Sequence, residues 1–488
     1  MLSAKVFGTS LIQSAFVVAF TIPNLLRRLF GEGALSASFI PAFSKSLENE
    51  SRTEAEHLGR RVLTLLGLFL STFVVLGIGI TFIIGIFIEP DGRLGTILPL
   101  LRIMFPYAVF ICMAAICMGM LNVLGDFRTP AFAPALLNIV WIGVLLGVCP
   151  FLKDEWSRIV AVSWGVVFAG FLQFWIQWRQ LRRKGWSFKA MWSGWLDSRV
   201  VYVWKQALPA AIGAGVIQIN VCLDFGLAMW ASEWAPSTLM YAERILYLPL
   251  GLISTAMGTV LLPTFSKQYA QGDTQGIKDS LCASLKDMAL VMIPATIGLI
   301  VLAFPIVELL YQRGAFDATA TLRTTRALWV YAPGLVVFSM QKIVSPLFYG
   351  MHDVKTPMRV AVASVFVNAT LNVILILTFP TEWKHVGIAA STVVCSFLAC
   401  AVLAVIAQRR IGRIAWGGIV SVSLKALLAA AVMAVAAWWS HGVLAKHTLS
   451  VIALGVSIAV GGAAYLAVLA LLYPQGARQL LKRRRGNR

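Results

Sequence analysis

Apolar stretches long enough to cross a bilayer recur along this chain from one end to the other. Leu63–Ile88, Met288–Val307 and Leu449–Leu472 are three of them. A helix needs roughly 20 mostly apolar residues to cross a hydrocarbon core of about 30 Å. The sequence therefore predicts an all-α fold in a polytopic membrane protein.

The composition agrees with this fold class. Hydrophobic residues make up 59% of the 488 residues and charged residues only 13%, which excludes an ordinary soluble domain. Counting apolar runs between polar breaks gives about thirteen spans. The polar breaks are too short to hold a large soluble domain, so they are expected to be linkers and short amphipathic segments.

The basic residues predict the orientation in the membrane. The net charge is +20, and a charge this high can indicate a protein that binds nucleic acid. The Lys and Arg residues, however, gather in short loops and in the tail KRRRGNR. Such clusters are typical of cytoplasmic loops that contact anionic lipid. Loops after the odd-numbered spans carry about 27 Lys and Arg, against about 9 after the even-numbered spans. We expect membrane lipids and no nucleic acid as partners, and a cytoplasmic C-terminus.

The N-terminal segment does not fit this count easily. Thirteen spans and a cytoplasmic C-terminus place the N-terminus outside, yet Met1–Gly8 is neither a signal peptide nor a full span. Either the chain starts outside, or a further N-terminal helix precedes this reading frame. The second alternative is the expected one.

Two motifs recur in the same order in the two halves of the chain. Phe39–Lys45 (FIPAFSK) returns as Leu261–Lys267 (LLPTFSK), and Gly125–Pro130 (GDFRTP) returns as His352–Pro357 (HDVKTP). The two offsets along the chain are nearly equal, which favours one duplication, a common plan in transporters. The alternative is chance similarity between apolar helices. We expect Asp126 and Asp353 to cap the helix that follows or to brace the moving lobe.

This repeat predicts the domain organisation. We expect an N-lobe over residues 1–185, with its first helix largely missing, and a C-lobe over residues 200–415. Two additional transmembrane helices follow in residues 416–475, and residues 476–488 form a basic cytoplasmic tail. Two lobes around a midplane cavity suggest alternating access.

Charged residues interrupt the first long apolar segment. Arg27, Arg28 and Glu32 lie between apolar runs, the second of which continues to Phe43. An Arg at the centre of a membrane helix costs roughly 3 kcal/mol on insertion scales, so it is kept where it faces a partner, a wet cavity or a ligand. Arg244 lies within a later span. Guanidinium groups bind phosphate and carboxylate in a forked geometry, so these arginines predict an anionic ligand. The alternatives are arginines that snorkel to the headgroups and, for Arg244, a local pair with Glu243.

Another set of polar residues is suited to a cation. Asp224 is an acid within a span, and Asn368 and Asn372 are four residues apart, on one helical face. Carboxylate and amide oxygens are ligands that a hard cation such as sodium prefers, and backbone oxygens near residues 386–392 would complete the shell. The alternatives are ordinary hydrogen bonds between helices and, for Asp224, a role as a proton carrier.

Catalytic chemistry is not predicted. The chain shows no Ser-His-Asp set, paired acidic motif or phosphate loop, and its seven cysteines form no CxxC pair. We expect a transporter without an organic cofactor. Four further polar residues either line the cavity or pack between helices; they are Asn138, Gln173, Gln177 and Gln218.

Four segments resemble the MurJ/MviN family of lipid II flippases, which belongs to the multidrug/oligosaccharidyl-lipid/polysaccharide exporter superfamily. They are PNLLRRLFGEGALSASFIPAF, TPAFAPALLNI, YAERILYLPLGLI and GTVLLPTFSK. The resemblance covers nearly the whole chain. It implies a fourteen-helix fold with two six-helix lobes and two extra helices. The implied substrate is the undecaprenyl-pyrophosphate-linked peptidoglycan precursor, carried from the inner to the outer leaflet of the bacterial cytoplasmic membrane.

The resemblance also implies roles for single residues. The cavity arginine of the family's LLRR motif falls on Arg27, the acid of the EGA motif on Glu32, and the second-lobe arginine on Arg244. An anion site in some members, where chloride would bind, uses an asparagine that matches Asn138. Some members bind sodium between helices that correspond to those of Asp224, Asn368 and Asn372. The family's first helix, with an R-x-x-G-x-x-R-D motif, has only its end matched by Met1–Gly8.

The functional prediction is a monomeric lipid-linked glycan flippase in which Arg27 and Arg244 grip the pyrophosphate. The alternative within transport is an ion-coupled drug or polysaccharide-lipid exporter of the same superfamily. A drug exporter for cations should present acids in its first-lobe cavity. A membrane-embedded glycosyltransferase and a non-transporting scaffold are the alternatives from other classes.

Overall fold

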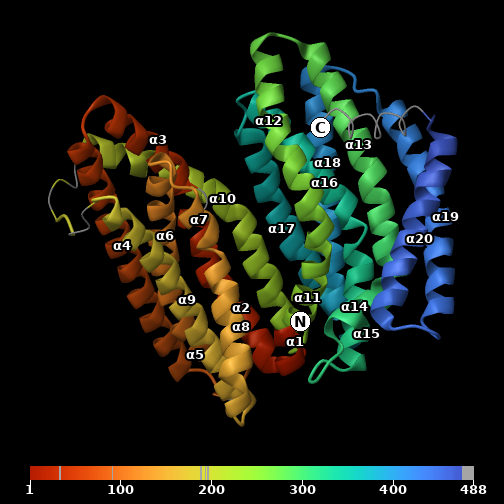
Figure 1. The fold of residues 1–488 in the computed structure, drawn as a ribbon, viewed down its shortest axis with the longest axis horizontal. Helices are drawn as coiled ribbons and strands as arrows, with labels where there is room; N and C mark the ends of the chain where they lie inside the picture. Colours follow the sequence, from red (N-terminus) through yellow and green to blue (C-terminus); the bar gives the residue numbers. More distant parts are fainter. Residues whose placement is uncertain (32–33, 91, 187–189, 193, 195–196, 475–488) are drawn as a thin grey trace. The chain divides into compact units, whose positions relative to one another are not determined.

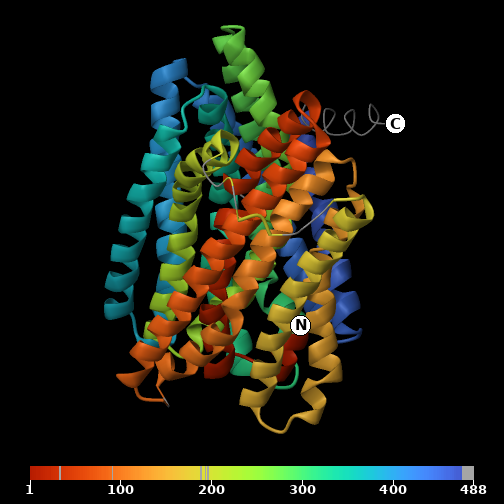
Figure 2. The same cartoon turned by 90° about the vertical axis from the view of Figure 1, so that its left-hand side faces the viewer.

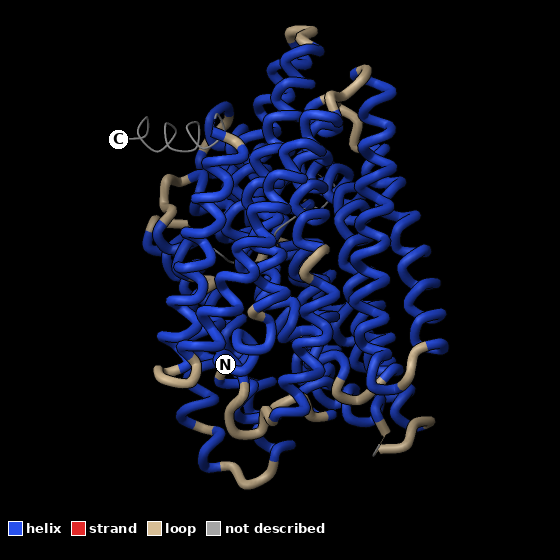
Figure 3. The backbone as a smooth tube through the Cα atoms, turned by 90° about the vertical axis from the view of Figure 1, so that its right-hand side faces the viewer, coloured by secondary structure: helices blue, strands red, loops and turns tan. Residues whose placement is uncertain are grey.

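The structure is a computed structural model of the chain. It describes residues 1–31, 34–90, 92–186, 190–192, 194 and 197–474, and the statements below concern these residues. They form helices joined by short loops, and no strand occurs among them (Figure 3). The predicted all-α fold class is confirmed.

The chain divides into two compact units (Figure 1). We call Val6–Ser237, with Leu2, the N-unit, and Thr238–Arg488, with Met1 and Ser3–Lys5, the C-unit. The expected lobe boundaries at 185 and 200 stay a prediction.

Helices of the N-unit run along one another as a bundle (Figure 2). The helical elements up to its end are α1 (Leu2–Phe7), α2 (Leu11–Leu26), η1 (Arg27–Gly31), α3 (Ala34–Asn49), α4 (Arg52–Ile86), α5 (Arg93–Met104), α6 (Pro106–Val123), α7 (Arg128–Phe132), α8 (Ala135–Gly147), η2 (Cys149–Phe151), α9 (Glu155–Arg183) and α10 (Ser198–Ala231). The long helix α10 packs against α2 and α3. A core of aromatic and aliphatic side chains, Phe39, Leu66 and Tyr107 among them, joins these helices.

The C-unit continues with a second series of helices. They are α11 (Ala235–Pro249), which begins just before the boundary, η3 (Leu250–Ser254), α12 (Thr255–Ala270), α13 (Thr274–Val301), α14 (Ala303–Tyr311), α15 (Ala318–Tyr331), α16 (Gly334–Gly350), α17 (Lys355–Thr378), η4 (Thr381–Trp383), α18 (Lys384–Ile411), α19 (Trp416–Leu444) and α20 (Ser450–Leu472). The last two pack on each other and on α13. Leu290 of α13 is buried among residues of α19 and α20.

Nine helical stretches among the described residues are long and apolar enough to cross a membrane. The bent pair α15–α16, with an angle of 44° at Pro333, brings the number to ten. The chain is therefore a polytopic membrane protein, with fewer candidate spans than the thirteen expected. In residues 11–39 and 237–265, the apolar run is divided between shorter helices and a π-helical turn.

Side-chain caps set the starts of several helices. Ser51 and Asp273 stand before α4 and α13, and each accepts a hydrogen bond from a backbone N–H three residues on. Such caps satisfy donors that the first turn of a helix leaves open. The separation of the two caps along the chain equals the offset of the FIPAFSK repeat. α4 and α13 therefore begin at equivalent places in the repeat.

The second repeated motif also has the same local structure in both units. After α6, Gly125 has a φ of 74° and the N–H of Asp126 donates to Leu121 O; after α16, His352 has a φ of 58° and the N–H of Asp353 donates to Phe348 O. The Asp126 carboxylate accepts from Thr129 N at 3.3 Å, and that of Asp353 from Thr356 N at 3.1 Å. The predicted capping role of the two aspartates is confirmed.

Each aspartate is also tied to a third helix of its unit. Gln180 of α9 donates to Asp126 at 2.6 Å, and Arg410 of α18 forms an ion pair with Asp353 at 2.7 Å. The loop between two helices is thus fixed to a third helix in both units.

Candidate functional site

The paired arginines lie on a π-helical turn, η1, between α2 and α3. Arg27 is half-buried and its Nε donates to Asn24 Oδ1 at 2.8 Å. Arg28 is exposed, and its Nη1 donates to Gln218 Oε1 of α10 at 3.1 Å. Each guanidinium group carries five N–H donors, and such groups bind phosphate and carboxylate in a forked geometry. Glu32 lies outside the described residues.

The turn that carries these arginines has a counterpart in the C-unit. η3 spans Leu250–Ser254 and is also a π-helix, and it follows η1 at nearly the same offset as the repeated motifs. Prolines within the preceding helices, Pro23 in α2 and Pro249 in α11, remove backbone donors nearby. Single π-helical turns are rare and occur frequently at functional sites. The form of this break in the helix was not predicted from the sequence.

Arg244 lies on α11, in the C-unit. It is exposed, and its guanidinium makes no hydrogen bond or ion pair to the described residues. The alternative, a local pair with Glu243, is not formed. Glu243 Oε1 instead accepts from Tyr331 Oη at 3.3 Å. Tyr331 was not predicted, because only the fold brings α15 to α11.

The expected cation ligands are divided between the two units. Asp224 of α10 is half-buried and accepts from Asn220 Nδ2 at 3.2 Å. Asn368 and Asn372 are buried on α17, in the C-unit. The predicted shared face is confirmed for the two asparagines, since both direct their Oδ1 atoms at Ser391 Oγ of α18.

The surroundings of Ser391 are rich in oxygen. Its Oγ is 3.0 Å from Asn368 Oδ1, close to Asn372 Oδ1, and 3.0 Å from Ile388 O. A hydroxyl has one proton to donate, so it cannot satisfy three acceptors at once. Ser391 lies within the region 386–392 that the sequence singled out for its backbone oxygens. No group of three or more His, Cys, Asp and Glu with metal-ligand geometry occurs in the described ranges.

Asn138 is exposed on α8, and Gln173 and Gln177 are buried on α9. The Gln177 side chain donates to the Gln173 backbone oxygen at 3.0 Å, which is a packing contact. Gln218 binds Arg28, as described above.

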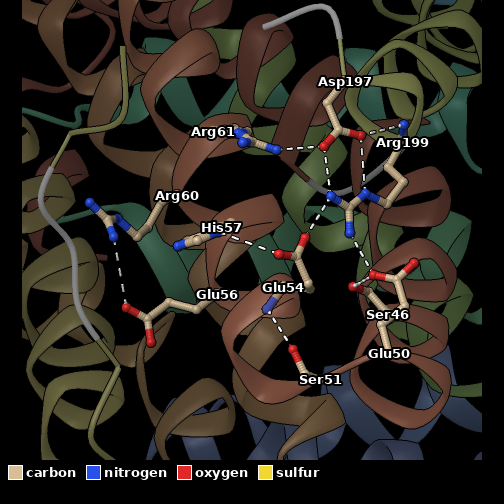
Figure 4. Close-up of polar contacts among 10 residues, drawn as sticks. All are labelled: Ser46, Glu50, Ser51, Glu54, Glu56, His57, Arg60, Arg61, Asp197 and Arg199. Atoms are coloured by element: carbon tan, nitrogen blue, oxygen red, sulfur yellow. Dashed lines mark hydrogen bonds and ion pairs between the residues drawn. The ribbon is translucent and has the colours of Figure 1, made fainter. Parts of the chain in front are cut away.

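An ionic cluster joins α3, α4 and the start of α10 (Figure 4). Arg199 contacts Asp197 at 2.6 Å, Glu54 at 2.8 Å and Glu50, and Arg61 pairs with Asp197. Hydrogen bonds from Arg199 lower the pKa of Asp197 to about 2. The cluster holds the N-terminal end of α10 against α3 and α4.

Two helical series with the same caps, the same π-helical turns and charged residues within apolar segments define a membrane transporter built from an internal repeat. The family model "Lipid II flippase MurJ" matches residues 3–477. The chain is 31% identical to the probable lipid II flippase MurJ of Bdellovibrio bacteriovorus over 98% of this chain and 91% of the relative. It is 32% identical to the lipid II flippase MurJ of Burkholderia cenocepacia over 77% of this chain and 74% of the relative. The chain belongs to the lipid II flippase MurJ family.

Solved structures agree on the fold. A lipid II flippase MurJ in an inward closed conformation has a TM-score of 0.79 at 24% identity, covering 98% of this chain and 95% of that chain. An inward-facing multidrug transporter of the MATE family has a TM-score of 0.71 at 13% identity, covering 84% of this chain and 93% of that chain. The family confirms the expected class, a lipid transporter of the membrane, and the resemblance read from the sequence.

Proposed function

We propose that this chain carries lipid II, the undecaprenyl-pyrophosphate-linked peptidoglycan precursor, from the inner to the outer leaflet of the cytoplasmic membrane by alternating access. The family supplies the substrate class. The observation that carries the proposal is the π-helical turn η1, which holds Arg27 and Arg28 within an apolar segment. A buried or half-buried arginine in such a segment is costly unless it serves a ligand.

The finer architecture belongs to this proposal. Two lobes of six helices and two additional helices make the fourteen spans of the family, of which about thirteen are expected here. The equivalent caps at Ser51 and Asp273 and the matching loops at Asp126 and Asp353 support the repeat. The C-terminus is cytoplasmic, and the chain acts as a monomer.

Arg27 and Arg244 bind the pyrophosphate in this proposal. A pyrophosphate presents several anionic oxygens, which guanidinium forks bind in pairs. The exposure of Arg244 and its lack of a partner among the described residues leave its donors open to such a ligand. Arg28, Glu32 and Asn138 are assigned supporting contacts to the substrate or, for Asn138, to chloride.

We assign sodium to the oxygens around Ser391. Asn368, Asn372 and the Ile388 carbonyl supply hard neutral donors, and three acceptors around one hydroxyl proton fit a cation better than a hydrogen-bond network alone. Asp224, on α10 of the N-unit, stays the carboxylate that the sequence predicts for a cation. The oxygens around Ser391 would hold the ion when it binds.

Complementation of a strain depleted of its own lipid II flippase tests the function. The wild-type chain should restore growth, and Arg27→Ala and Arg244→Ala should each abolish rescue while reaching the membrane at wild-type level. Arg128→Ala, which removes an exposed arginine of a loop helix, is the matched control and should rescue. Rescue by both arginine variants would overturn the pyrophosphate assignment, and failure of the correctly inserted wild-type chain would overturn the lipid II assignment.

The fold favours one further candidate, an ion-coupled exporter of drugs or polysaccharide lipids, because the MATE transporter shares it. A strain that lacks its drug exporters separates the two functions. Drug resistance conferred by this chain, without rescue of the flippase-depleted strain, would favour the exporter.

A further inference from the structure

A groove of about 420 Å³ lies on the N-unit between α4, α6 and α9. Three of its lining residues, Arg60, Thr64 and Ser71, are polar or charged, and all three belong to α4. The rest of the wall is apolar or aromatic. Residues 190–192 close part of it, and the N–H of Met191 donates to Thr64 Oγ1 at 3.1 Å. The groove is therefore part of the folded N-unit, and none of its lining residues belongs to η1.

The groove has the length of a lipid chain in one leaflet. Arg60 and Ser71 are eleven residues apart on α4, which is about 16 Å at 1.5 Å per residue. One leaflet contributes about 15 Å to a hydrocarbon core of about 30 Å. Trp178 and Trp192 lie at the same end as Arg60, because α4 begins and α9 ends there. Tryptophan and arginine together are typical of the membrane interface.

The equivalent face of the C-unit is covered by protein. Leu68 and Leu290 hold equivalent positions on α4 and α13, because each lies equally far along its helix from the cap. Leu290 is 4% exposed beneath α19 and α20, whose Tyr465 Oη donates to Leu290 O at 2.6 Å. Leu68 is 42% exposed and lines the groove. In a membrane protein, apolar surface that the described residues leave exposed is covered by the bilayer.

Charge decides which lipid fits. Arg60 carries a guanidinium group, which binds phosphate in a forked geometry, and it forms an ion pair with Glu56 at 4.0 Å (Figure 4). A second guanidinium, that of Arg182, lies 5.0 Å from the ring centre of Trp178. The loop charges place this end in the cytoplasmic leaflet, which carries the anionic lipids. A lipid phosphate at Arg60 would therefore meet positive charge at one end of the apolar groove.

We infer that this groove binds one acyl chain of an anionic phospholipid, with the lipid phosphate at Arg60 and the chain running along Gly67 and Leu68 toward Ser71. The lipid occupies on the N-unit the position that α19 and α20 occupy on the C-unit. The site is distinct from the one proposed for the pyrophosphate of the substrate.

Two variants test the site from opposite ends. Arg60→Gln removes the charge at the headgroup end. Gly67→Phe fills the groove. Its Cβ would meet Met113 Sδ at 3.5 Å, which is an ordinary van der Waals contact that α4 can accept without moving. Lys45→Gln removes an exposed cation of the same unit outside the groove, and Leu76→Phe enlarges a side chain on the same helix that is 61% exposed. These two are the matched controls.

Native mass spectrometry of the purified full chain, titrated with phosphatidylglycerol or phosphatidylcholine, measures the binding. The wild type should bind one phosphatidylglycerol more tightly than phosphatidylcholine. Arg60→Gln should weaken this binding about fivefold, from the roughly 1 kcal/mol that a basic residue contributes near anionic lipid. Gly67→Phe should weaken it at least about tenfold, since each buried CH₂ contributes about 0.8 kcal/mol. Both controls should stay within about twofold of the wild type.

Three results would overturn the inference. They are equal affinity for the two phospholipids, equal losses in test and control variants, and a loss of undecaprenyl phosphate binding with phosphatidylglycerol binding unchanged. The last result would assign the groove to the tail of the substrate. Arg60→Gln keeps most of the length of the side chain and inserts no bulk into the groove, so it remains informative if Gly67→Phe fails to fold.

Discussion

At the scale of single residues, the two repeated loops differ where the backbone turns left-handed. Gly125 has a φ of 74°, and the equivalent position holds His352 with a φ of 58°. A residue with a Cβ loses roughly 1 kcal/mol or more in this conformation, whereas glycine does not. The contact of the His352 ring with Tyr269, at 6.2 Å between ring centroids, offsets part of this cost.

Substitutions at the two positions should therefore have opposite effects. Gly125→Ala should lower the free energy of unfolding by about 1 kcal/mol, since its Cβ would meet nothing within 4 Å and only the backbone term changes. His352→Gly should be more stable than His352→Ala by about 1 kcal/mol, because both lose the ring contact and only glycine relieves the backbone. Denaturant unfolding of the purified variants measures both differences. Equal stability of His352→Gly and His352→Ala would contradict the prediction.

At the scale of elements, the ionic cluster of Arg61, Asp197 and Arg199 anchors α10. Asp197→Asn keeps a side chain that caps α10 but removes the charge that two guanidinium groups share. We expect a loss of about 1 kcal/mol, because the partly exposed cluster is screened by solvent. Thermal unfolding of the purified chain measures the loss, with Glu48→Gln, an exposed acid at the end of α3, as the control. A wild-type melting curve for Asp197→Asn would show that the cluster does not anchor the helix.

The same cluster makes the stability of the fold depend on pH. The folded pKa of Asp197, about 2, lies below the ordinary value of about 3.9. A depressed pKa contributes stability that is fully present above the ordinary value and is lost as the pH falls through the folded value. The difference in melting temperature between the wild type and Asp197→Asn should thus be constant above about pH 5 and disappear as the pH falls from about 4 to about 2. A difference that grows in acid would contradict this sign.

Some elements of the structure are predicted by the sequence, and others are not. The apolar run Leu63–Ile88 predicts most of α4, and the D-x-[RK]-T-P motif predicts the caps at Asp126 and Asp353, because both signals are local. The π-helical turns at Arg27 and Leu250 are not predicted, since packing and the nearby prolines decide how the hydrogen-bond pattern breaks. Contacts such as Arg61–Asp197 and Asn372–Ser391 join distant segments, so only the fold can bring them together.

At the scale of the whole molecule, the loop charges and the helix order make a prediction about membrane orientation. The loop between α8 and α9 contains Lys153 as its basic residue, whereas α9 ends with Arg182 and Arg183. The turn between α12 and α13 follows Lys267 and precedes Lys278 and Lys286. By the excess of basic residues on the cytoplasmic side, Lys153 should face outward and Gln271 should face the cytoplasm.

Cysteine labelling checks this orientation in the complete chain. The native cysteines give a low background, because five are buried and the other two, Cys222 and Cys400, are half-buried within helices. A membrane-impermeant maleimide should label Lys153→Cys in spheroplasts and Gln271→Cys only after lysis, since both positions are exposed. The reverse pattern would place the basic loops outside. It would also remove the groove at Arg60 from the anionic cytoplasmic leaflet, so this one experiment bears on both the transport direction and the lipid site.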